Sequence, residues 1–593
     1  MSEGEEKKEE PAPRKKAEPT PTEARIAPLE PKHERLVIAG IALLFLVHLS
    51  YYFPRVVDDV FISVRYAENL ARGHGAVYNL GEKVEGYSSP SWMFVQAFAC
   101  LLHLEPVTFG KLVAVGCLFA TAWGARQIAR EMFGVVSWHS FVPAVLIAVN
   151  SYLVDWTVLG LETPLHIASL VLAPLMVHRA LENPARKTRI WAAASLVVLG
   201  ATRPESPLYV IICTLAPLAF RPRTRATVME AARYVVPAGV ILALLLLLRR
   251  AYYHDWFPNT YHVKGAHEVF ALGKLADLWG HGSRPSEIAQ MIGGSIALGY
   301  FGWKQKALTP VLIVLADLYF TASVQVDWMP SLRHLLPVLA FAPIGTACVL
   351  EEALRRQSTT VRASLLVVCV NACWDVGRVD SRLSTLEVRD KWVQKKTLEK
   401  WSDSFLAYRR IEPPHVTKMN NYAMGQIAQC WPVLDTSKEP IAETWYAGRD
   451  IGALGYLTEV NVWDTAGLVT REVSMDPQFA QHFVSKELTE QMFAKRPVSA
   501  DLYEGWDTAV SKRPATWLRY KVTNGEQRDP NQIVASDREA PSSEERLRRY
   551  RRLAEKMPHL FHLHTLYGEA VGAAVEKRLK VVENEEAHKS VPQ

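Results

Sequence analysis

Residues 36–53, LVIAGIALLFLVHLSYYF, decide the class of fold because they form a long run without Asp, Glu, Lys or Arg. A helix needs about 20 predominantly apolar residues to cross the hydrocarbon core of a bilayer. The run is too long and starts too late for a cleavable signal peptide, and it lacks a small-residue cleavage site. It is therefore predicted to be a retained membrane-spanning helix.

Similar apolar runs recur up to residue 379, whereas residues 380–593 are polar and charged. The further runs lie at 112–125, 141–156, 165–177, 190–201, 207–220, 234–248, 288–303, 308–320, 334–350 and 363–374. A soluble fold would expose this apolar surface to water. The sequence predicts a polytopic α-helical membrane protein with about 11 transmembrane helices, and with residues 89–104 as a juxtamembrane or re-entrant helix.

Three regions are predicted. Residues 1–35 are charge-mixed and Pro-rich and are expected to be a disordered tail. Residues 36–379 form the membrane domain. Residues 380–593 are expected to be a separate mixed α/β domain, in which IGALGYL (451–457) and VNVWDTAGL (460–468) are interpreted as short strands. Within it, Trp445, Tyr446 and Trp463 are interpreted as core residues, with glycan stacking as the alternative.

The distribution of Lys and Arg predicts the orientation. Basic short loops occur at 124–134, 178–189, 221–233, 302–306 and 351–362, and such loops favour the cytoplasmic side. The tail is then cytoplasmic, the C-terminal region is extracytoplasmic, and the number of spans is odd. The net charge of +6 is small and spread out, so nothing indicates a nucleic-acid partner.

Asp58 and Asp59 lie a few residues outside the first span, on the predicted outer side. Apolar residues after them follow helical spacing, which predicts an amphipathic helix along the membrane surface. Asp is favoured at a helix N-cap and complements the helix dipole. Capping and catalysis are therefore both open for this pair.

The other outer loops concentrate ionisable and polar residues. Such groups are costly at the edge of a bundle unless they pair or line a wet cavity. Taken singly, Glu162 fits a helix N-terminal acid, Arg203 and Glu205 fit a structural ion pair, and Lys264 fits a solvated lysine. Taken together, they predict an outward-facing polar cavity. The full set is Glu85, Glu162, Arg203, Glu205, Asn259, His262, Lys264, Asp327 and Arg333.

The motifs that contain these residues resemble a known family. DDVFISVRYAENLARGHGAVYNLGEKVEGYSSPSW (58–92) resembles the first periplasmic loop of GT-C superfamily glycosyltransferases, in particular the branch with the mycobacterial terminal arabinofuranosyltransferase. Similar motifs follow in order: GLETPL (160–165), TRPESPLY (202–209), PNTYHVK (258–264), VDWMPSLRHLLP (326–337) and a weaker patch at 449–468. Three positions depart from the pattern, because Ser206 and Val326 replace glycines and Leu332 replaces an aromatic residue.

The resemblance implies a bacterial inner-membrane enzyme that moves a sugar from a polyprenyl phosphate to a glycan or glycolipid acceptor, with inversion. Asp58 or Asp59 would be the general base. Asp58 is favoured because the first acid of such a pair is the usual catalytic residue in this superfamily. Lys264, His262, Arg203 and Arg333 would meet the donor phosphate. Sugar or acceptor contacts would come from Glu85, Tyr87, Trp92, Glu162, Glu205, Asn259 and Asp327.

Several alternatives remain beside this interpretation. Tyr87 and Trp92 also fit an interfacial aromatic belt. No cysteine or histidine spacing resembles a metal site, so no cofactor is expected, although some related branches use a divalent ion. A transporter or flippase for a lipid-linked sugar, or a non-catalytic envelope-assembly scaffold, would explain the same membrane bundle. The sequence names neither the sugar nor the acceptor.

Overall fold

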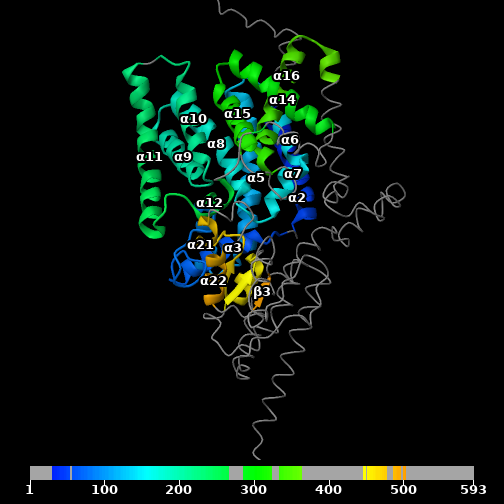
Figure 1. Ribbon diagram of the computed structural model, residues 1–593. Coiled ribbons are helices and arrows are strands. Elements are labelled where there is room, and N and C mark those ends of the chain that lie inside the picture. The colour runs from blue at the N-terminus through cyan, green and yellow to red at the C-terminus, as the bar shows by residue number, and fades with distance from the viewer. Residues whose placement is uncertain are drawn as a thin grey trace, which may run out of the picture.

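The computed structural model describes residues 30–53, 56–222, 224–265, 271, 285–323, 333–363, 445–448, 451–476, 485–495 and 499–501. Most of them form a bundle of helices (Figure 1). Its elements are α2 (Pro31–Tyr52), α4 (Pro90–Leu101), α5 (Pro106–Glu131), η1 (Trp138–Phe141), α6 (Val142–Val149), α7 (Ser151–Val158), α8 (Thr163–Glu182), α9 (Arg186–Gly200), α10 (Ser206–Leu215), η2 (Ala216–Leu218), α11 (Arg225–Tyr253), α14 (Pro285–Lys304), α15 (Leu308–Ser323), η3 (Arg333–Leu335) and α16 (Leu336–Arg355).

The apolar runs coincide with these helices up to residue 350, and the run at 363–374 lies almost wholly outside the described residues. Among the described helices, five are long and apolar enough to cross a membrane, or six if the bent pair α6–α7 is one span. This pair bends by 57° at Asn150, whose side chain caps α7 through the Leu153 amide. The chain is thus a multi-pass membrane protein, while the number of about 11 spans stays a prediction.

Two boundaries at the start of the bundle can be compared with the sequence. The predicted boundary of the tail at residue 35 lies too late in the sequence, because helix α2 begins at Pro31. Proline is favoured in the first turn of a helix, and Glu34 in that turn forms a 2.5 Å ion pair with Arg126 of α5. The helix within 89–104 has 12 residues. It is shorter than a span of about 20 residues, and its juxtamembrane or re-entrant placement stays a prediction.

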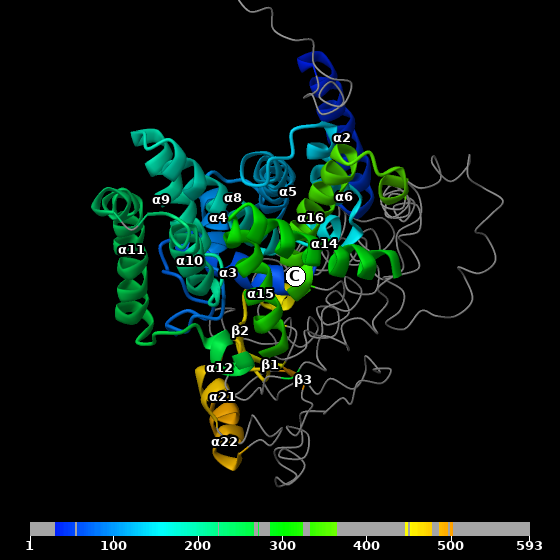
Figure 2. The same cartoon turned by 90° about the horizontal axis from the view of Figure 1, so that it is seen from above.

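A second group of elements lies at one end of the bundle, below most of its helices in Figure 1. It contains α3 (Asp59–Ala71), α12 (Asn259–Gly265), β1 (Trp445–Gly448), α20 (Gly452–Thr458), β2 (Asn461–Asp464), α21 (Arg471–Met475), α22 (Lys486–Ala494) and β3 (Ser499–Asp501). Helices α12 and α21 lie side by side (Figure 2). The strands form a parallel sheet in the order β2-β1-β3, with Tyr446 opposite Val462 on one side and Ser499 on the other.

The sequence prediction for the region 451–468 was half right. VNVWD contains strand β2, as predicted, but IGALGYL is the helix α20 rather than a strand. A short apolar run has no clear period, so neighbouring groups decide its conformation. Tyr446 and Trp463 are buried, which confirms the core interpretation for these two residues.

The described C-terminal elements share one hydrophobic core with the segment after the first span. Ile451, Leu454 and Val462 belong to the same buried cluster as Val60 and Tyr78. Polar contacts reinforce this packing: the Asn79 amide donates to the Val462 carbonyl, and the Val462 N–H donates back to Asn79, both at 2.8 Å. Most of 380–593 lies outside the described residues, so an independent domain there remains a prediction.

Candidate functional site

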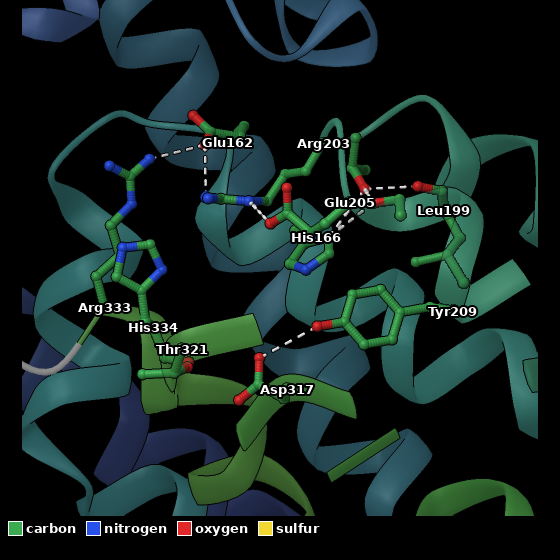
Figure 3. Close-up of polar contacts among 12 residues, drawn as sticks. Glu162, His166, Leu199, Arg203, Glu205, Tyr209, Asp317, Thr321, Arg333 and His334 are labelled. Atoms are coloured by element: carbon green, nitrogen blue, oxygen red, sulfur yellow. Dashed lines mark hydrogen bonds and ion pairs between the residues drawn. The ribbon is translucent and has the colours of Figure 1, made fainter. Parts of the chain in front are cut away.

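Glu162 is the centre of an ion-pair network at the end of the bundle next to α3. One of its carboxylate oxygens, Oε1, accepts hydrogen bonds from Nη1 of Arg203 at 3.1 Å and from Nη2 of Arg333 at 2.8 Å. On the other side of Arg203, its Nε–H donates to Glu205. Figure 3 shows Glu162 between the two guanidinium groups. Three motifs far apart in the sequence, GLETPL, TRPE and the arginine of SLRHLLP, therefore meet at one place.

Burial and charge act in opposite directions on Glu162. Burial alone would raise the pKa of this carboxyl, but Arg333 and Arg203 outweigh it and hold the pKa below its usual value. The Arg333 guanidinium also lies over the ring of Trp156, 5.1 Å from its centroid. The network thus contains two cations and two carboxylates, all largely buried. It holds two guanidinium groups in a fixed arrangement beside each other.

A chain of polar side chains continues from this network into the bundle. His166 Nδ1 lies 2.9 Å from the Thr202 hydroxyl, which lies 3.1 Å from the Ser206 hydroxyl. Ser206 thus adds a hydroxyl next to His166. Below them, the Tyr209 hydroxyl donates to Asp317 of α15 at 3.3 Å (Figure 3).

Asp58 and Asp59 stand at the start of α3, but Asp58 does not cap that helix through its side chain. Its carboxylate instead accepts two hydrogen bonds from the start of α20, from the amides of Gly452 and Ala453, both at 2.7 Å. Of the two roles left open for the pair, capping of α3 by the Asp58 side chain is not observed, because a second helix start approaches the same carboxylate. Asp59 is the first residue of α3 and is half-buried.

Backbone contacts join the start of α3 to the Glu162 network. The Val57 amide donates to the Leu159 carbonyl at 3.4 Å, and the indole N–H of Trp92 donates to the Gly160 carbonyl at 2.9 Å. The Ser91 amide donates to Ala201 at 3.2 Å. The acidic pair and the ion-pair network therefore lie on neighbouring segments. Trp92 itself is buried inside the bundle.

Glu85 belongs to a second ion pair, with Arg249 at the end of α11. The carboxylate Oε2 lies 2.7 Å from Arg249 Nε. Burial raises the pKa of Glu85 to about 7, and the attraction of Arg249 offsets only part of that shift. Next to this pair, the Tyr87 hydroxyl lies 3.1 Å from that of Tyr253, and the Tyr87 ring packs edge-on against Tyr66.

Asn259 connects α12 to the C-terminal segment. Its side-chain amide donates to the carbonyls of Gly467 at 2.6 Å and Leu468 at 3.1 Å, and its carbonyl accepts from the Ser474 hydroxyl at 2.7 Å. Its backbone amide donates to the Glu85 carbonyl at 2.8 Å. All of the polar atoms of this side chain are thus used within the protein.

Two of the remaining predicted site residues, His262 and Lys264, lie on α12. His262 Nε2 is 3.1 Å from a carboxylate oxygen of Asp255, which also pairs with Arg471 at 2.9 Å. The structure gives the backbone of Lys264, as part of α12. Asp327 lies outside the described residues. Within the described part of the chain, no three or more His, Cys, Asp or Glu side chains are grouped as metal ligands.

Two cations that the sequence analysis did not select hold this end together. Arg249 follows the leucine-rich run of α11 and pairs with Glu85. Arg65 lies on α3, where its Nη1 donates to the Gly455 carbonyl at 2.7 Å and its Nε to the Tyr78 carbonyl at 2.8 Å. In the sequence, Arg249 is an arginine at the end of an apolar run and Arg65 is an arginine on an amphipathic helix, and composition alone ranks neither above the other arginines.

No family model and no curated protein sequence matches the chain. Among solved structures it is similar to ArnT from Cupriavidus metallidurans bound to undecaprenyl phosphate, with 13% identity and a TM-score of 0.43 over 75% of this chain and 88% of ArnT. It is also similar to an Archaeoglobus fulgidus oligosaccharyltransferase in its apo form, with 11% identity and a TM-score of 0.45 over 81% of this chain and 67% of that one. At these TM-scores, the function has to be argued from the residues of the site.

Proposed function

We propose that this protein is a membrane glycosyltransferase of the GT-C type. It moves a sugar from a polyprenyl phosphate to an envelope glycan or glycolipid on the outer face of a bacterial inner membrane. The observation that carries the proposal is the meeting of Glu162, Arg203 and Arg333 next to the segment that holds Asp58 and Asp59. A transfer from a phosphate carrier needs a base and cations within one site.

The reaction assigns a task to each group. The acceptor hydroxyl gives its proton to Asp58 or Asp59, and its oxygen forms a bond to the anomeric carbon. The bond between that carbon and the phosphate oxygen breaks, and the electron pair leaves with the polyprenyl phosphate. A positioned base contributes about 10²–10⁴-fold to such a step.

Arg203 and Arg333 meet the charge that develops on the leaving phosphate. Each guanidinium has a fork of N–H donors that suits phosphate oxygens, and Glu162 holds both groups next to each other. Preorganised donors of this kind are worth about 10²–10³-fold. His262 and Lys264, both on α12, are the further cations that we assign to the donor phosphate. Glu85, Glu205 and Asn259 support this frame, and any sugar contacts would add to the contacts they make within the protein.

The test is binding of a long-chain polyprenyl phosphate to the purified protein in lipid nanodiscs. Arg203→Gln and Arg333→Gln are each expected to weaken binding at least about tenfold, because a charge-assisted pair is lost. Arg179→Gln is the matched control, since Arg179 pairs with Glu131 at the opposite end of α8. Equal binding by all three variants would contradict the proposal.

One observation favours a second candidate, transport of a lipid-linked sugar. Asp317, Tyr209 and His166 are buried between helices, and transporters place polar groups inside the bundle. The two candidates separate in proteoliposomes. Replacing both Asp58 and Asp59 by Asn should abolish sugar transfer, whereas translocation of a labelled lipid-linked sugar would persist in a transporter.

A further inference from the structure

An exposed aromatic surface lies where α11 ends and α12 begins, and it consists of Trp256, Phe257 and Tyr261. These side chains are 44%, 48% and 42% exposed. The rings of Phe257 and Tyr261 are stacked, with their centroids 4.5 Å apart and an angle of 21° between their planes. Large aromatic side chains gain free energy when they leave water. Three of them exposed in one short segment therefore indicate an interaction surface.

Two exposed cations lie over aromatic rings at the same helix end. The guanidinium carbon of Arg250 is 5.8 Å from the ring centroid of Trp256. The ammonium nitrogen of Lys83 is 4.9 Å from the ring centroid of Tyr252, which lies in the last turn of α11. Arg and Lys side chains at a span end keep their charge at the headgroups while their stems contact apolar groups. Aromatic rings combined with positive charge suit the phosphate headgroups of lipids.

The course of α11 gives the depth of this surface. With 29 residues, α11 is about 43 Å long, which exceeds the hydrocarbon core of about 30 Å. Its exposed apolar run ends at Leu248, so residues 249–253 lie beyond the core. The chain then changes direction at His254, and α12 lies at the level of the last turns of α11 (Figure 1). The aromatic surface is therefore at the depth of the lipid headgroups.

The polar side chains of the same turn are fixed to the protein. Asp255 accepts a hydrogen bond from the Phe257 amide at 3.2 Å, and it pairs with His262 at 3.1 Å and with Arg471 of α21 at 2.9 Å. Asn259 is buried and donates to the Gly467 carbonyl. The turn thus directs its polar groups toward the protein and leaves its aromatic rings exposed.

We propose that the aromatic surface inserts into the lipid headgroup region of the leaflet on the side of α3, with Arg250 and Lys83 at the lipid phosphates. The surface continues the exposed apolar side of α11, which faces lipid in a membrane-spanning helix. This continuity favours a phospholipid surface over a soluble glycan as the occupant. The contact holds α12, with His262 and Lys264, at the depth of membrane phosphates. The proposal does not depend on the reaction that the protein catalyses.

The test is tryptophan fluorescence of the full-length protein in nanodiscs of brominated phosphatidylcholine. Bromine quenches indole fluorescence on contact, and the lipids carry it either near the headgroup or near the chain end. The difference between the wild type and Trp256→Phe isolates Trp256 among the 17 tryptophans. An interfacial apolar face lies about 5–10 Å into the headgroup boundary, so shallow bromines should quench the Trp256 component at least about twofold more than deep ones.

Trp463→Phe is the control, because Trp463 is buried in β2. Its component should have the same intensity in brominated and unbrominated lipids. Tyr261→Trp in the Trp256→Phe background is a second reporter, which replaces the first if Trp256 contributes no fluorescence. It should show the same preference for shallow bromines.

Equal intensity of both reporters in brominated and unbrominated lipids would overturn the proposal. If dissolved iodide then quenched them, the aromatic surface would lie in water and suit a soluble occupant such as an acceptor glycan. Stronger quenching by the deep bromines would also overturn the proposal, because it would place the turn inside the hydrocarbon core.

Discussion

Nη2 of Arg333 lies 2.8 Å from Oε1 of Glu162, although 171 residues separate the two in the chain. The same oxygen holds Arg203, so one carboxylate positions two cations. Removing one partner of a buried ion pair leaves an uncompensated charge. Glu162 is therefore the residue on which the geometry of both arginines depends.

Glu162→Gln should lower the free energy of unfolding by on the order of 3 kcal/mol, since two buried guanidinium groups lose their shared charge. Unfolding of the detergent-solubilised protein measures this change. Glu182→Gln is the control, because Glu182 pairs with Arg221 at the other end of α8 and its side chain is 57% exposed. An exposed pair is worth less than about 1 kcal/mol. Equal losses in the two variants would contradict the prediction.

The raised pKa of Glu85 predicts that the free energy of unfolding depends on pH. Its pKa in the folded protein is about 7, raised from 4.5 by burial, so the folded state binds this proton more tightly than the unfolded state. The contribution of Glu85 is then fully present below pH 4.5 and is lost as the pH rises to about 7. Unfolding measured from pH 5 to pH 8 should show this decline, and Glu85→Gln should flatten it. A decline of the same size in the variant would assign it to other groups.

Asn259→Ala should detach the segment 467–474 from α12. The variant leaves the carbonyls of Gly467 and Leu468 and the hydroxyl of Ser474 without their partner. The cost is on the order of 2–3 kcal/mol, because these are buried hydrogen bonds. Faster proteolysis within 467–474 would report the detachment. Asn183→Ala, at the exposed end of α8, should leave the cleavage rate as in the wild type.

Gly160→Ala should disturb the turn that positions Glu162. Gly160 has φ +93°, and a Cβ there would lie 2.9 Å from Val60 Cγ2 of α3. Strain and overlap together cost about 2–4 kcal/mol. Gly134→Ala measures the backbone strain alone, because Gly134 has φ +69° and no atom lies within 4 Å of the added Cβ. The losses in the unfolding free energy of the two variants should therefore differ, and equal losses would exclude the contact with Val60.

The sequence was most informative where a single physical pattern dominates. Hydropathy located the helices of the bundle, since each apolar run up to residue 350 needs only its own residues to form a helix. The motifs also placed Glu162, Arg203 and Glu205 on one side of the membrane bundle. The sequence does not predict which carboxylate pairs with which guanidinium group, because the pairing depends on how α8, α10 and η3 pack.

The errors arose where distant segments decide local structure. The start of α20 donates its amides to Asp58, and Arg65 donates to the carbonyl of Gly455 in the same helix, and neither contact can be read from IGALGYL. For the same reason Asp58 does not cap its own helix. Arg249 was missed because an arginine after a span is common, and only the fold brings it to Glu85.

The proposed function is sugar transfer that depends on Asp58 and Asp59. The most direct measurement is mass spectrometry of envelope glycans and glycolipids from cells with the wild-type protein, with a deletion, and with both Asp58 and Asp59 replaced by Asn. We predict that one glycan loses a fixed sugar mass in the deletion and in the double variant, and that the double variant is present at the wild-type protein level. A double variant that restores the wild-type glycan would contradict it.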